Sequence, residues 1–114
     1  MQSTTQDRVT SNLVQQANRL LTSGRFDAAR MVIAALRRST AATIEADHIE
    51  ARLHMAEGHM PDAIRLLDGA IDRTPASPTL HLLRAEARSC VDDHAGAAAD
   101  AAEATVLAPE DARA

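Results

Sequence analysis

Residues 46–75, ADHIEARLHMAEGHMPDAIRLLDGAIDRTP, contain two apolar stripes at helical spacing with a turn signal between them. Apolar residues that recur every three or four positions mark one face of an amphipathic helix. Gly58 separates the stripes, and Pro61 suits the first turn of the second helix, where the missing backbone donor costs nothing. The first stripe is Ala46, Ile49, Leu53 and Ala56, and the second is Ala63, Ile64, Leu67, Ala70 and Ile71. The segment therefore predicts a helix-turn-helix unit.

The same unit recurs along the chain at a fixed offset of 34 residues. The equivalent residues are Ala17, Ala51 and Ala85; Ala29, Ala63 and Ala97; Gly24, Gly58 and Asp92; Leu36, Ala70 and Ala104; and Ala41, Pro75 and Pro109. A unit this small cannot bury its own apolar face and must stack on its neighbours. We therefore predict an all-α solenoid of six helices in three repeats, 10–43, 44–77 and 78–109, with a polar lead-in at 1–9 and a tail at 110–114.

The outer repeats carry their own helix signals. In the first, Ser23-Gly24-Arg25 interrupts the helical pattern. In the third, Ser77 and Pro78 are a plausible N-cap and first helical residue, and the turn falls at Asp92-Asp93 before a last helix at 95–107. No segment alternates with period two for long enough to be a strand.

Small residues recur where two helices of a hairpin would touch. Alanine stands at the eighth and twentieth positions of every repeat, where a larger side chain would push the helices apart. Pro75 and Pro109 come just after the second helix of their repeats, where proline ends a helix. We expect the alanines to be buried.

With this period and these small residues, the chain resembles the tetratricopeptide repeat family over about residues 10–109. The resemblance implies a right-handed superhelix whose first helices line a concave groove that holds an extended or helical peptide. The implied lining residues are Val14, Asn18 and Leu21; His48, Arg52 and Met55; and Leu82, Glu86 and Ser89. Asn18, Arg52 and Glu86 share one repeat position and would form a polar row able to pair with a peptide. Packing within the superhelix is the alternative role for the apolar members of this set.

The sequence departs from the family pattern at its large apolar positions. These positions hold Leu13, Asp47 and His81; Gln16, Glu50 and Arg84; and Leu20, His54 and Arg88. A shift of about one residue in the first helices of repeats two and three would place Ile49 and Leu83 in the leucine position, so the register there stays open. Of the clamp with which one branch of the family binds acidic chaperone C-termini, only Asn18 matches, which argues against that branch.

Composition excludes several classes of protein. A net charge of −4, one Phe and no Tyr or Trp argue against a nucleic-acid partner. The N-terminal residues lack the apolar core of a signal peptide, and no stretch of the sequence is apolar enough over about 20 residues to span a bilayer. Cys90 is the only cysteine, so no intrachain disulfide can form. We therefore expect a cytoplasmic protein. All 12 basic residues are Arg and 25 residues are Ala, which suggests a bacterial protein from a GC-rich genome.

Charge is uneven along the chain. Residues 58–114 hold ten acidic residues and five Arg, whereas residues 1–57 hold six acidic residues and seven Arg. A solvated helix face explains this bias, and steering of a basic partner segment is the alternative.

We expect no catalytic, cofactor or metal site. His48 and His54 are six residues apart, not the four that pair two ligands on a helix, and His59 lies in a turn. Cys90 and His94 have a turn between them and no further ligands at suitable spacing. Asp92 and Asp93 are better explained as a helix cap than as an acid-base pair.

The favoured function is therefore that of an adaptor or small chaperone that holds a partner peptide or helix in the groove. One alternative is the N-terminal docking domain of a longer enzyme, such as a glycosyltransferase, and a weaker one is a small chaperone of the type III secretion kind. Because no polar capping helix follows Pro109, the last helix would either end the array itself or dock on a second copy, a partner or a further domain.

Overall fold

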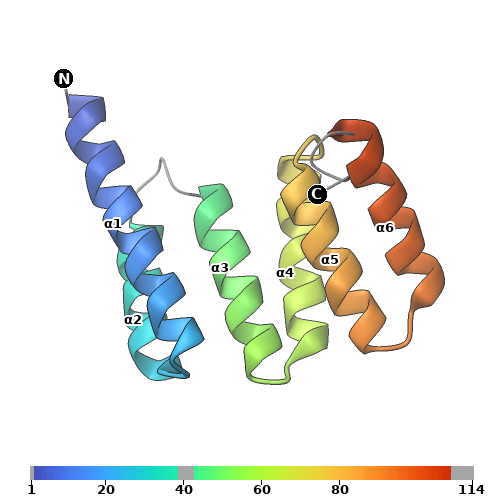
Figure 1. Ribbon diagram of the computed structural model, residues 1–114. Helices are drawn as coiled ribbons and strands as arrows, with labels where there is room; N and C mark the ends of the chain where they lie inside the picture. Colours follow the sequence, from blue (N-terminus) through green and yellow to red (C-terminus); the bar gives the residue numbers. More distant parts are fainter. Residues whose placement is uncertain (1, 39–42, 109–114) are drawn as a thin grey trace.

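The computed structural model describes the backbone of residues 2–38 and 43–108, and their side chains from Arg8 on. This part of the chain forms six α-helices and no strand, which confirms the all-α prediction (Figure 1). The helices are α1 Gln2–Thr22, α2 Phe26–Arg37, α3 Thr43–Ala56, α4 Met60–Arg73, α5 Pro78–Cys90 and α6 His94–Leu107.

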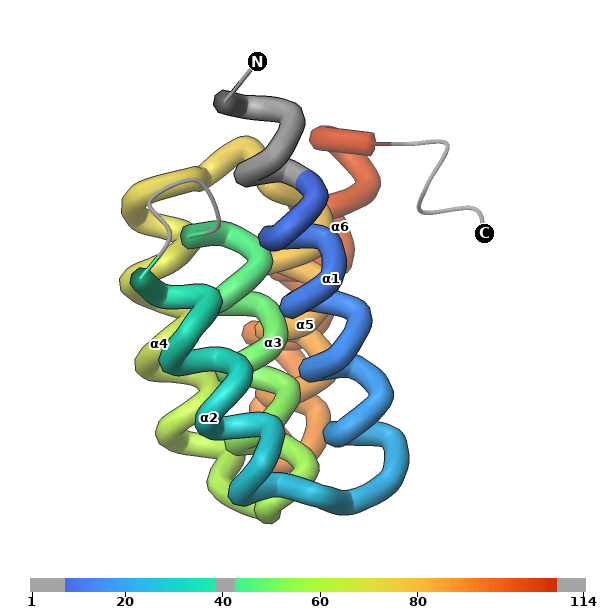
Figure 2. The backbone as a smooth tube through the Cα atoms, turned by 90° about the vertical axis from the view of Figure 1, so that its left-hand side faces the viewer, coloured from blue at the N-terminus to red at the C-terminus, as the bar shows by residue number. Residues whose placement is uncertain are grey.

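The helices stand side by side in chain order (Figure 1), and each packs against the next one along the chain. In addition, α3 contacts both α1 and α5. Seen from the side, α2 and α4 lie toward one face of the molecule and α1 toward the other (Figure 2). Helix α3 therefore lies at the centre, in contact with α1, α2, α4 and α5.

Three turns of one design close the helix pairs α1–α2, α3–α4 and α5–α6. In each, the residue directly after the left-handed position donates its amide to a carbonyl of the preceding helix. The bonds run from Arg25 to Leu20 (2.9 Å), from His59 to His54 (2.7 Å) and from Asp93 to Arg88 (2.9 Å). The left-handed residues are Gly24, Gly58 and Asp92, with φ of 76°, 82° and 64°. This is the Schellman ending of a helix, and it recurs at the predicted offset.

The core contains the predicted alanines. Ala17, Ala29, Ala51 and Ala63 are fully buried, and Ala97 is nearly so. The exception is Ala85, which is only half-buried. In α5 the buried stripe is Leu80, Leu83 and Ala87, so the small buried residue of this helix comes two positions later than predicted.

Two carboxylates are buried in ion clusters between helices. Asp47 on α3 is 2.8 Å from a guanidinium nitrogen of Arg37 on α2 and 2.8 Å from one of Arg73 on α4. Asp100 on α6 accepts hydrogen bonds from Arg84 and Arg88 on α5. Each carboxylate thus joins its helix to a neighbour.

The predicted caps of the third repeat are confirmed. Ser77 Oγ accepts from the Leu80 amide at 3.4 Å, and Asp93 Oδ1 accepts from the Gly96 amide at 3.0 Å. The lead-in at 1–9 is helical from Gln2 on and belongs to α1, while Ala41, Pro109 and the tail at 110–114 lie outside the described residues. In the described part of the chain, no helix combines the length and apolarity needed to cross a membrane.

Candidate functional site

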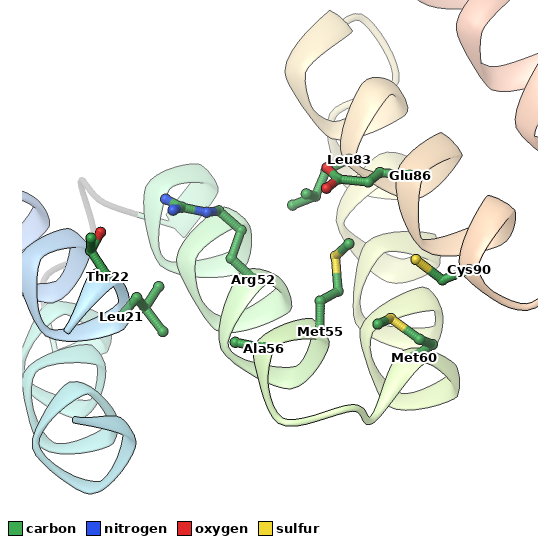
Figure 3. A pocket seen from close by; sticks show the side chains of 9 residues that line it. All are labelled: Leu21, Thr22, Arg52, Met55, Ala56, Met60, Leu83, Glu86 and Cys90. Carbon is green, nitrogen blue, oxygen red and sulfur yellow. The ribbon is translucent and has the colours of Figure 1, made fainter. Parts of the chain in front are cut away.

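Two pockets adjoin along the face that α3 shares with α1 and α5. The larger, about 340 Å³, opens between these three helices and the start of α4 (Figure 3). The smaller, about 260 Å³, lies nearer the start of α3. Arg52 lines both pockets, and we refer to the two together as the groove. The larger pocket is lined by Leu21, Thr22, Arg52, Met55, Ala56, Met60, Leu83, Glu86 and Cys90, and the smaller by Val14, Asn18, Ile44, Glu45, His48, Ile49, Arg52, Ser77 and Thr79.

Seven of the nine side chains expected to line a groove are brought together here. They are Val14, Asn18, Leu21, His48, Arg52, Met55 and Glu86. Leu82 and Ser89 line neither pocket, and Leu83 and Cys90, each one residue further along α5, line the larger one instead. The groove side of α5 therefore keeps Glu86 but differs from the expected one at the other two positions, and one residue along a helix rotates the side chain by about 100°.

The centre of the groove is polar. Arg52 extends toward α1 (Figure 3), and its Nη1 donates to Asn18 Oδ1 at 2.5 Å. Two members of the expected polar row are therefore in contact, and the third, Glu86, lines the same pocket as Arg52. Burial of His48 and the nearby charge of Arg52 lower the pKa of that imidazole below its ordinary value. Arg52 is thus the cation at the centre, beside a histidine that favours its neutral form.

The rest of the groove is largely apolar. Leu21 projects from α1, Met55 from α3 and Leu83 from α5 into the same space, with Met60 at the start of α4 (Figure 3). Methionine side chains are flexible and polarizable, and they adapt to different apolar partners. A largely apolar surface with one Arg and two Glu, Glu45 and Glu86, suits a segment that presents apolar side chains on one side.

A third pocket, about 640 Å³, lies on the opposite side of α3, between α2, α3 and the α3–α4 turn. Its lining includes His54, Glu57 and His59, whose potential ligand atoms all lie within 4.8 Å of one another. We call these three residues the turn cluster. His59 was not expected to be a ligand because it lies in a turn, but this turn folds His59 back beside His54. Histidine, glutamate and histidine at positions i, i+3 and i+5 around a helix-ending glycine were the signal that was missed.

The Asp92-Asp93 pair has the structural role expected for it. Asp93 caps α6, and Asp92 occupies the left-handed position of the turn. Both side chains are solvent-exposed, so neither lies in a pocket suited to acid-base chemistry.

The chain matches no protein-family model, and no curated protein is significantly similar to it in sequence. Its function is therefore inferred from the geometry of its own residues.

Proposed function

We propose that the chain is a three-repeat, right-handed solenoid of the tetratricopeptide type and acts as a protein-interaction module, an adaptor or small chaperone that holds a peptide or helix of a partner protein in the groove. The observation that carries the proposal is the pair of adjoining pockets along α3, which share Arg52 and bring together seven residues from the expected lining positions.

The repeat geometry supports the solenoid part of this proposal. The three Schellman turns are spaced by the same 34 residues as the sequence repeat, and their hydrogen bonds are equivalent. The first helices of the repeats, α1, α3 and α5, contact one another through α3. A stack in which each unit contacts only its neighbours has this arrangement of contacts.

The chemistry of the groove indicates what kind of segment would bind. Met55 and Met60, both half-buried, offer most of the apolar surface that a partner could cover, because Leu21 and Leu83 are only 9% and 6% exposed and belong to the core. Arg52 now donates to a neutral amide oxygen, and a carboxylate on the partner would be a stronger acceptor. We therefore expect a segment with apolar residues along one side and an acidic residue positioned to reach Arg52.

The test is selection of binders from a random peptide display library on the wild-type chain, followed by affinity measurements on two variants. Met55→Glu places a charge in the larger pocket. Met31→Glu is the matched control, because Met31 on α2 is 74% exposed and lines none of the three pockets. We expect the selected peptides to bind Met31→Glu like wild type and Met55→Glu at least about tenfold more weakly, since a buried unpaired charge costs more than 1.4 kcal/mol.

Cys90 offers a second, independent readout. Its thiol is exposed and lines the larger pocket, so a peptide in the groove should slow its alkylation by a maleimide reagent. Selected peptides that bind Met55→Glu as tightly as wild type and leave the alkylation rate of Cys90 unchanged would show that the groove is not the binding surface.

A further inference from the structure

The α3–α4 turn lies at the bottom of the view in Figure 1. It brings together three side chains of metal-binding type. His54 and Glu57 are three residues apart at the end of α3, on one face of the chain. Gly58 then reverses the direction of the backbone, and the His59 amide donates to the His54 carbonyl at 2.7 Å. The turn itself therefore places His59 beside His54.

The equivalent turn of the third repeat shows that side chains at these two positions reach each other. Arg88 and Asp93 stand 34 residues after His54 and His59, and Arg88 Nε lies 3.7 Å from Asp93 Oδ2. The positions of His54, Glu57 and His59 correspond to Leu20, Ser23 and Arg25 in the first repeat and to Arg88, Val91 and Asp93 in the third. Only the middle repeat carries two imidazoles and a carboxylate there, the donor set typical of zinc.

One nitrogen of His54 lacks a hydrogen-bond partner, and the other lies near a carboxylate. Nδ1 is buried and has no hydrogen-bond partner. Nε2, on the other side of the ring, lies 3.9 Å from Glu50 Oε2. A metal-binding histidine commonly coordinates through one nitrogen while the other faces a carboxylate that fixes the ring. Coordination through Nδ1 would give the buried nitrogen of His54 the partner that it lacks.

Glu57 is held in place by an arginine that occupies one of its oxygens. Arg30 on α2 donates to Glu57 Oε2 from both terminal nitrogens, at 2.9 and 2.6 Å. Both bonds go to the same oxygen, so Oε1 is available as a ligand. Carboxylates that bind a metal through one oxygen and accept hydrogen bonds at the other are a common arrangement.

We propose that the turn cluster binds a Zn²⁺ ion through His54, Glu57 and His59, with water as the fourth ligand on the side of the 640 Å³ pocket. Ligand atoms on a tetrahedral zinc ion lie about 3.3 Å apart, so no two of the three groups need to close by more than about 1.5 Å. His59 is exposed and free to rotate toward the others. The site lies across α3 from the groove, so it is independent of the proposed peptide binding.

The test is titration of the chain, produced without a histidine tag, with ZnCl₂ in a calorimeter, and with Co²⁺ followed by its visible absorption. His59→Asn removes one ligand from an exposed position. His94→Asn is the matched control, because His94 is exposed beside the equivalent turn of the third repeat. We expect one ion per chain, an affinity lowered at least about tenfold by His59→Asn, and no change in His94→Asn.

Glu50→Gln provides a further variant, which keeps all three ligands and removes the carboxylate beside Nε2. It should weaken zinc binding by about tenfold or more. Zinc should also raise the melting temperature of the wild type and not that of His59→Asn, while the two should melt alike in chelator. Equal zinc affinity of wild type and His59→Asn, equal weakening by His94→Asn, or no saturable binding at submillimolar zinc would each overturn the proposal.

Discussion

Replacement of Asp100 by Asn should be among the most destabilising single changes in the chain. The carboxylate is 3% exposed and accepts three hydrogen bonds, from Arg84 Nε and Nη2 at 3.0 and 2.8 Å and from Arg88 Nη1 at 2.8 Å. His81 Nδ1 lies 3.6 Å from Oδ1, the oxygen that accepts from Arg84 Nη2. Asparagine fills the same volume but carries no charge, and one of its two terminal atoms is a donor that faces other donors.

The expected magnitude follows from the burial of the two arginine partners. Removal of one partner from a buried ion pair typically costs about 3–5 kcal/mol. The side chains of Arg84 and Arg88 are 15% and 24% exposed, so water can solvate them in part and the lower end applies. We predict a loss of about 3 kcal/mol in the free energy of unfolding, or roughly 10–15 °C in melting temperature for a chain of this length.

The pH dependence supplies a second, sharper test. Burial acts to raise the pKa of Asp100, but hydrogen bonds from Arg84 and the charges of Arg84 and Arg88 outweigh it and hold the pKa below the ordinary 3.8. A lowered folded-state pKa means that the stabilisation is complete above the unfolded pKa and is lost as pH falls through the folded one. The difference in stability between wild type and Asp100→Asn should therefore be constant from about pH 7 to 5 and shrink below 3.8.

The assay is urea denaturation followed by far-ultraviolet circular dichroism over this pH range. Asp92→Asn is the control, because Asp92 is exposed and its side chain is 91% accessible. That change should stay within about 0.5 kcal/mol of wild type, since asparagine also tolerates a left-handed backbone. The reasoning fails if Asp100→Asn costs less than about 1 kcal/mol, or if its deficit persists unchanged at acidic pH.

Three further changes test separate parts of the structure. Asp92→Gly should stabilise the chain by about 0.5–1 kcal/mol in urea denaturation, because the backbone there has the φ of 64° that the equivalent Gly24 and Gly58 adopt without strain; a loss of stability would contradict this. Ala63→Leu should cost about 1–3 kcal/mol by overpacking a fully buried position, whereas Ala98→Leu on the exposed side of α6 should leave the unfolding midpoint nearly unchanged. Docking of a second copy on α6, one of the alternatives for this helix, predicts a dimer by light scattering that Ala101→Arg converts to monomer, and an unchanged mass would exclude that face.

The sequence was informative where structure depends on local backbone or on a small side chain, with Ala85 as the exception. The left-handed turn positions Gly24, Gly58 and Asp92 could be predicted because a helix end needs one residue of that kind at a fixed place. Ala29 and Ala63 could be predicted as buried because only a small residue allows close approach of two helices.

The ion clusters could not be predicted in this way. Asp47, His81, Arg84 and Arg88 stand at positions where the tetratricopeptide pattern has large apolar residues, and nothing in the neighbouring sequence explains the difference. Their partners come from other helices: Arg84 bonds Asp100, 16 residues away, and Asp47 bonds Arg73, 26 residues away. Periodicity describes one helix at a time, so it carries no information on pairs that form between helices.

The same limit explains what was misjudged at the candidate sites. Leu82 and Ser89 were expected in the groove, but the side of α5 that reaches it is set by how α5 packs on its neighbours, and Leu83 and Cys90 line the pocket. The turn cluster was missed because the i, i+4 rule for helical metal ligands does not cover a pair that meets across a Schellman turn.

The attachment of α6 leads to a last prediction. In the described part of the chain α6 packs against α5 alone, and its buried residues are Ala97, Asp100 and Ala104. Two alanines bury little apolar surface, so the ion cluster of Asp100 carries much of the attachment. Helix α3, by contrast, contacts four other helices. In native-state hydrogen exchange, amides of α6 should therefore open at a lower free energy and exchange faster than those of α3. Uniform protection of the two helices would contradict this.

Because α5 supplies Leu83, Glu86 and Cys90 to the groove, a peptide bound there should also slow exchange in α5, and through it in α6.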